Sequence, residues 1–106
     1  MQIFNFMQTI CDDENIHLSA LPNMERLGGV AIKTPEQARG IAYSEMLESW
    51  PRVSTIAHEL AHHALGHFEA PICKEQKERE AQIFASTFTA IAMFFEYLQK
   101  FREIKV

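Results

Sequence analysis

The stretch HELAHHALGH, residues 58–67, decides how the rest of this chain is interpreted. It places His58 and His62 four residues apart, with Glu59 directly after the first histidine. On an α-helix, residues i and i+4 lie on the same face, so both imidazoles can reach one metal ion. Glu59 then lies beside the ion, where its carboxylate can take a proton from a bound water. The stretch therefore predicts a metal-binding helix with Glu59 as its catalytic base.

The elements around this helix are predicted from periodicity and turn residues. The helix itself is expected to begin just after residues 51–53, with Ser54 or Thr55 as N-cap, and to end near Gly66. Before it, we expect an amphipathic helix over residues 2–12 and strands over residues 16–20, 30–33 and 40–44. After it, a long helix runs from Lys74 toward the end of the chain. Because sequential strands usually neighbour one another, the predicted fold is an α+β domain with a small three-stranded sheet.

The composition of the chain limits the classes of function and the compartment that we expect. The 106 residues form one domain, 1–106, with a net charge of −4 and with acidic and basic residues mixed along the chain. No basic patch is present for a phosphate backbone, so no direct nucleic-acid binding is expected. The N-terminus has no basic n-region, and the longest apolar stretch, residues 83–95, is too short to span a bilayer. With two cysteines that form no disulfide framework, we expect a cytoplasmic protein that does not bind a membrane.

A catalytic zinc typically has three protein ligands, so we expect a third ligand downstream of His62. His67 lies more than a full turn beyond His62 and is rotated off the ligand face, and Cys73 has no second cysteine nearby. Glu80 and Glu78 lie at the start of the next helix. We expect the inward face of that helix to consist of Phe84, Thr87, Phe88, Ile91 and Phe95. One turn before Phe84 lies Glu80, so Glu80 is the favoured third ligand, with Glu78 as the alternative.

These two segments resemble the ImmA/IrrE metallopeptidase family. The resemblance rests on HELAH continuing through LGH at residues 65–67, and on the segment EREAQIFA at residues 78–85. It implies a small zincin-like domain with a gluzincin-type Zn²⁺ site, in which His58, His62 and Glu80 are the metal ligands and Glu59 is the catalytic base. Gln82 departs from the asparagine common in the family, and Ser86-Thr87-Phe88-Thr89 replaces its Leu-Leu-Met-Pro-like run.

The predicted function is zinc-dependent hydrolysis of a peptide bond in a protein substrate. The resemblance implies that this substrate is a DNA-binding helix-turn-helix repressor, or another regulatory protein of a mobile element, prophage or stress response. An edge strand of the sheet, for which residues 40–44 were the candidate, would pair with an extended substrate. Tyr43, His63 and His67 are the candidates for stabilising the oxyanion.

A second hypothesis is a non-catalytic module whose zinc site is structural or vestigial and which binds a regulator without cleaving it. An exposed remainder of the surface from Phe88 to Phe101 would favour dimerisation or capture of a partner, so a homodimer stays open. The presence of Glu59 argues against this hypothesis, because a purely structural site has no use for a base at that position.

Overall fold

The structure, a computed structural model, describes residues 2–22, 24 and 28–103. Helix α1 (Gln2–Asp13) precedes three strands, β1 (Ile16–Leu21), β2 (Gly29–Lys33) and β3 (Arg39–Ser44). Helix α2 (Ser49–Ala64) carries the two histidines, and helix α3 (Lys74–Glu103) follows it. The predicted α+β class and the order of elements are confirmed, with three strands and the expected long final helix.

The strands form one mixed sheet in the order β1-β3-β2. Strand β3 runs parallel to β1 and antiparallel to β2, with Gly29 opposite Tyr43 and Ile16 opposite Arg39. Because β3 is paired on both sides, it has no free edge. The expectation that residues 40–44 form an edge strand for substrate is therefore wrong, and β2 and β1 are the outer strands.

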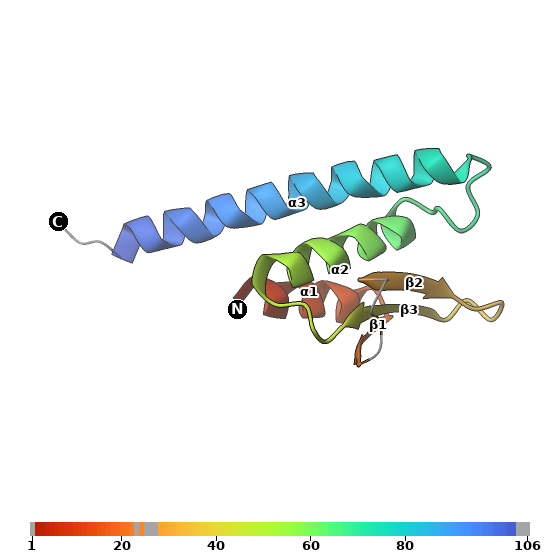
Figure 1. Cartoon of the computed structure of the whole chain (residues 1–106), viewed down its shortest axis with the longest axis horizontal. Helices are drawn as coiled ribbons and strands as arrows, with labels where there is room; N and C mark the ends of the chain where they lie inside the picture. Colours follow the sequence, from red (N-terminus) through yellow and green to blue (C-terminus); the bar gives the residue numbers. More distant parts are fainter. Residues whose placement is uncertain (1, 23, 25–27, 104–106) are drawn as a thin grey trace.

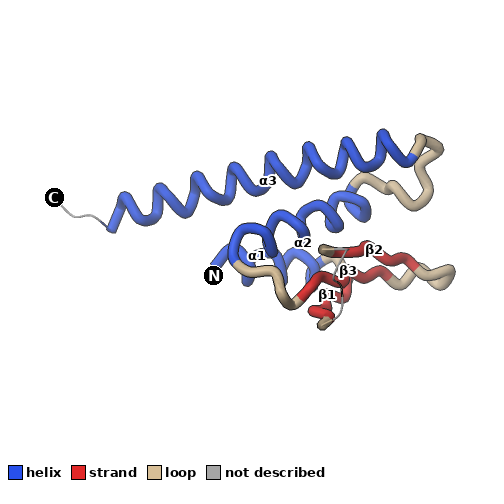
Figure 2. Tube along the Cα trace, viewed as in Figure 1, coloured by secondary structure: helices blue, strands red, loops and turns tan. Residues whose placement is uncertain are grey.

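Helix α2 lies between the sheet and α3 (Figures 1 and 2) and packs against β2, β3, α1 and α3. One core cluster joins Met7 of α1, Tyr43 of β3 and Ile56 of α2 to Ala85 of α3. A second cluster joins Cys11, Ile16, Ile41 and Leu60. These clusters contain residues of α2 on both sides of His58 in the sequence, Ala57 in the first and Leu60 in the second. Core packing therefore fixes the position of the histidine helix.

Helix α2 begins earlier than predicted, at Ser49, and Glu48 is its N-cap without a side-chain capping bond. The predicted N-caps Ser54 and Thr55 instead lie inside the helix. Pro51 falls in the first helical turn, where its missing N–H costs nothing because the first backbone N–H groups have no partner within the helix. The prediction treated this proline as a boundary, although it is compatible with the start of the helix.

Helix α2 ends as predicted, with Gly66 in the left-handed region at φ +66°. The backbone N–H of Gly66 donates to the carbonyl of His63 at 3.2 Å, and that of His67 donates to the carbonyl of His62 at 3.0 Å. This pair of hydrogen bonds is a Schellman motif, which reverses the chain direction at a helix end. It brings His67 back beside the last turn of α2.

Helix α3 packs on α2 through small residues. Ala81, Ala85 and Ala92 are buried, and Phe88 packs against the core. Thr87, Ile91 and Phe95 are exposed, so the inward face predicted from these larger residues is wrong in part. Alanines permit a close approach of two helices, and this stripe sets the rotation of α3 about its axis.

The second half of α3 extends beyond α2 (Figure 1), and many of its large apolar residues are exposed: Ile91, Met93, Phe94, Phe95, Tyr97, Leu98 and Phe101. By length and composition alone, α3 also meets the criterion for a membrane-spanning helix, with a mean hydropathy of 1.3 over its most apolar window. A core helix of a soluble protein can meet the same criterion, and the first half of α3 packs on α2.

Candidate metal centre

Three side chains from two helices converge at the predicted site. The potential ligand atoms of His58, His62 and Glu78 all lie within 4.8 Å of one another. Nε2 of His58 is 2.9 Å from Oε2 of Glu78, and Nε2 of His62 is 3.2 Å from Oε1 of the same carboxylate. The two histidines therefore face one carboxylate, as their spacing on α2 predicted.

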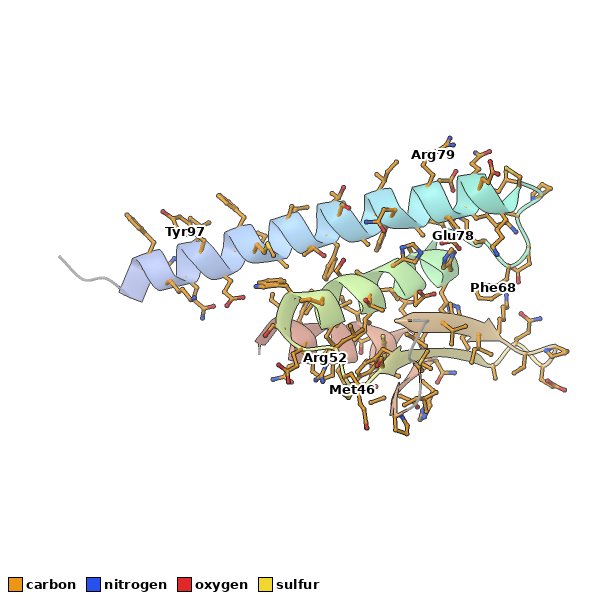
Figure 3. All side chains as sticks on the ribbon, in the orientation of Figure 1. Met46, Arg52, Phe68, Glu78, Arg79 and Tyr97 are labelled. Atoms are coloured by element: carbon orange, nitrogen blue, oxygen red, sulfur yellow. The ribbon has the colours of Figure 1, made fainter. Side chains whose placement is uncertain are left out.

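The carboxylate in this group belongs to Glu78, whereas Glu80 had been expected there. Glu78 lies on the side of α3 that faces α2, and Arg79 points away from the body (Figure 3). The carboxylate of Glu80 instead contacts Nε2 of His67 at 2.8 Å. The predicted placement of Glu80 toward the histidine pair is thus wrong, because the buried residues Ala81 and Ala85 mark the side of α3 that faces α2, whereas Ile91 and Phe95 of the predicted face are exposed. Ala85, Ala81 and Glu78 are spaced by four and three residues and therefore lie on one face of a helix. This spacing could have indicated Glu78 from the sequence.

The arrangement of hydrogen-bonding atoms fits a cation. Nδ1 of His58 lies 3.2 Å from Oε1 of Gln82, whose amide nitrogen donates to Oγ of Ser86 at 3.2 Å. Since Oε1 can only accept, Nδ1 of His58 carries a proton, and in a neutral ring with the proton there the lone pair is on Nε2, the atom that faces Glu78. A lone pair and a carboxylate oxygen repel unless a positive charge lies between them. Zinc ligands about 2.0–2.1 Å from the ion lie about 3.3 Å apart in a tetrahedron, close to the separations found here.

Glu59 is half-buried beside this group and lines the same cleft as His62 and Glu78. Burial raises its pKa and the charge of Glu78 adds to this, whereas His58 and the backbone amide of Ala31 act in the opposite direction. A carboxylate with a raised pKa is a better proton acceptor at neutral pH. Glu59 thus lies beside the ligand group and outside it, and its role as catalytic base stays a prediction.

The other candidate residues predicted from the sequence, Tyr43, His63, His67 and Cys73, lie outside the ligand group. Tyr43 is buried in the core and its ring packs edge-on against Phe4, so it does not reach the site. His63 is buried, stacks on Phe68 and hydrogen-bonds through Nε2 to the carbonyl of Gly40 at 2.8 Å. Burial lowers the pKa of His63. Cys73 is exposed and lies outside the ligand group. Of the three oxyanion candidates, only His67 lines the cleft.

The cleft has a volume of about 630 Å³ and is formed by strand β2, the end of α2 and the start of α3. Its lining residues are Gly29, Val30, Ala31, Glu59, His62, His67, Phe68, Lys74, Lys77 and Glu78. Sequence analysis missed the contribution of β2 and of the two lysines. The cleft therefore places outer strand β2, Glu59 and two members of the ligand group, His62 and Glu78, along one surface.

Comparison with known proteins agrees with this site. The family model Peptidase_M78, described as the IrrE N-terminal-like domain, matches residues 11–100, which include every element from β1 through most of α3. Searches of the curated proteins and of the solved structures gave no significant match. The chain therefore belongs to the Peptidase_M78 family and is a metallopeptidase with a His58/His62/Glu78 group.

Proposed function

We propose that the protein is a zinc-dependent peptidase that cleaves a regulatory protein, with His58, His62 and Glu78 as the metal ligands. The convergence of Nε2 of His58 and Nε2 of His62 on the carboxylate of Glu78 is the observation that carries this proposal. A zinc ion held there would supply Lewis-acid activation of water and of the scissile carbonyl. The donor set of two imidazoles and a carboxylate suits zinc and leaves room for a fourth, exchangeable position.

Glu59 acts as the general base in this proposal. Its carboxylate accepts a proton from the attacking water and then donates it to the leaving amine. The raised pKa of Glu59, caused first by burial, favours this exchange near neutral pH. Outer strand β2 lines the cleft beside Glu59, so an extended substrate would hydrogen-bond along residues 29–31.

We further propose that the substrate is a helix-turn-helix repressor, or another regulator of a mobile element, prophage or stress response, and that cleavage takes place in the cytoplasm. Family membership supports a regulatory substrate, and two free cysteines agree with a reducing compartment. The net charge of −4 disfavours a nucleic acid as a direct partner.

Metal analysis and cleavage mapping test this proposal together. Purified wild type should contain near-stoichiometric zinc, Glu78→Ala should lose it, and Glu59→Gln should retain it. New protein N-termini are then compared between cells that express wild type and cells that express Glu59→Gln. Termini that appear only with wild type, within helix-turn-helix regulators, would support the proposal. Absence of zinc from wild type after zinc is supplied would refute it.

A second candidate function is a binding module that captures a partner through α3. The exposed apolar residues of its second half, from Ile91 to Phe101, favour this reading because soluble monomers rarely expose large contiguous apolar patches. A homodimer is one form that such binding would take. Wild type and Glu59→Gln having identical effects on a regulator in cells would favour this candidate over the peptidase.

A further inference from the structure

His62, His67 and Glu80 form a continuous row of contacts that begins at one member of the ligand group and leads away from it. Nδ1 of His62 lies 2.9 Å from Nδ1 of His67, and Nε2 of His67 lies 2.8 Å from Oε1 of Glu80. His67 is only 3% exposed, so water cannot replace either contact without rearrangement. The other oxygen of Glu80 accepts a hydrogen bond from Gln76 at 3.2 Å, which fixes the carboxylate.

The direction of each hydrogen bond in this row follows from its acidic end. The carboxylate of Glu80 can only accept, so Nε2 of His67 carries a proton and donates it. In a neutral imidazole the other nitrogen is then an acceptor, which makes Nδ1 of His67 the acceptor for a proton on Nδ1 of His62. Nε2 of His62 is thereby left with its lone pair, and this atom faces Glu78.

We infer that His67 and Glu80 are positioning residues, which hold His62 in the single tautomer that can bind a metal through Nε2. The inference rests on the proposed metal site and adds a role for two residues outside it. Groups that hydrogen-bond to a ligand histidine fix its tautomer and ring orientation and raise its basicity, and their loss typically weakens metal binding about 10–100-fold. Glu80, expected from sequence to be a ligand, would act on the metal through two histidines.

The local backbone explains why His67 can fill this role. In a continuing helix, a residue five positions after His62 would point away from it. The Schellman motif at Gly66 reverses the chain, and the N–H of His67 donates to the carbonyl of His62. The backbone of His67 is thus tied to the same residue whose ring its side chain contacts.

Two kinds of measurement test the inference. The first is zinc affinity, by competition with a chromophoric chelator, for wild type and for His67→Leu, His67→Asn, Glu80→Ala and Glu80→Gln. The second is the tautomer of His62 in the zinc-free protein, read from ¹⁵N chemical shifts of its ring nitrogens. Glu75→Gln is the matched control, because Glu75 lies on the same helix and outside the row.

His67→Leu and Glu80→Ala should weaken zinc affinity roughly 10–100-fold while a full equivalent still binds at high zinc. His67→Asn and Glu80→Gln should recover part of the affinity, since each keeps an acceptor oxygen in the row. In wild type, the proton of His62 should reside on Nδ1, and His67→Leu should shift it toward a mixture. Glu75→Gln should match wild type in both measurements.

Unchanged affinity and an unchanged tautomer in His67→Leu would overturn the inference. So would complete loss of zinc from Glu80→Gln with retention in Glu78→Gln, because Glu80 would then be the ligand. If wild type binds no zinc at all, the proposed function fails, whereas the tautomer of His62 in the zinc-free protein still decides whether His67 positions it.

Discussion

A Cβ atom at Gly29 would lie 3.2 Å from Cγ of Glu59. The same atom would be 2.8 Å from Cγ2 of Thr55, a separation that real Cβ contacts do not adopt. Strand β2 therefore packs directly on the side of α2 that carries Glu59, the proposed catalytic base, and only glycine permits this approach.

Gly29→Ala should lower peptidase activity about tenfold or more while leaving zinc content unchanged. The methyl group displaces Glu59 or Thr55, and small misplacements of a catalytic group are costly in rate. Overpacking should also destabilise the fold by about 1–3 kcal/mol. Activity against a fixed peptide, metal content and thermal unfolding would be measured on the same preparations.

Gly28→Ala is the matched control for this substitution. Its added Cβ would meet its nearest atoms, both on Thr55, at 3.5 Å, an ordinary van der Waals separation. It should therefore behave like wild type. Full activity in Gly29→Ala would show that Glu59 does not depend on the close packing of β2.

The sequence was sufficient to predict the helix of residues 58–67 because two independent signals coincide there, the i, i+4 histidines and the apolar face. The third ligand position was harder. Helix α3 has apolar residues around most of its circumference, so periodicity did not show which stripe packs inward. The prediction assigned the large apolar residues to the inward face of α3, yet the small residues Ala81 and Ala85 are the buried ones. Helix α3 is rotated about its axis by part of a turn relative to the predicted orientation, so Glu78 and not Glu80 lies beside His58 and His62.

Two other features depend on contacts that a periodic pattern does not encode. The central place of β3 results from pairing with β1, more than twenty residues earlier, and no local signal specifies that order. His67 was placed by helical geometry, although the chain leaves the helix at Gly66 and turns back. The predicted helix end near Gly66 is confirmed, but the sequence pattern does not show that the ring of His67 turns back to contact His62.

Removing the metal should destabilise the protein. A ligand that binds only the folded state stabilises it by about 2.7 kcal/mol when its concentration is one hundred times Kd. For a domain of this size, each kcal/mol shifts Tm by about 4–8 °C. A chelator should therefore lower Tm by roughly 10 °C or more in calorimetry of the zinc-loaded wild type. Glu78→Ala should show almost no response to the chelator, and an equal response there would contradict the assignment of Glu78 as a ligand.

The charge of Lys77 should influence which peptides are cleaved. Lys74 and Lys77 line the cleft, and neither has an ion-pair partner among the residues that the structure describes. Cations at a helix N-terminus oppose the macrodipole, so helix stability does not account for them. Peptide pools with glutamate beside the cleavage position should be cleaved a few-fold faster than pools with lysine, as expected for exposed ion pairs.

Lys77→Glu should remove or invert this preference, and high salt should weaken the preference of wild type. Lys100→Glu makes the same charge change near the far end of α3 and should leave the preference intact. Equal rates for the glutamate and lysine pools with wild type would exclude a role for these lysines in substrate choice.

The two cysteines should differ sharply in reactivity toward a thiol reagent. Cys11 is fully buried, and burial, with a smaller contribution from Asp12, raises its pKa, so little thiolate forms at neutral pH. Cys73 is exposed. One thiol per chain should react quickly in the folded protein and two in denaturant, and Cys73→Ser should abolish the fast reaction. Because Cys73 lies outside the ligand group, zinc should not change its rate. Protection of Cys73 by zinc would instead make this thiol a metal ligand and require a different coordination sphere.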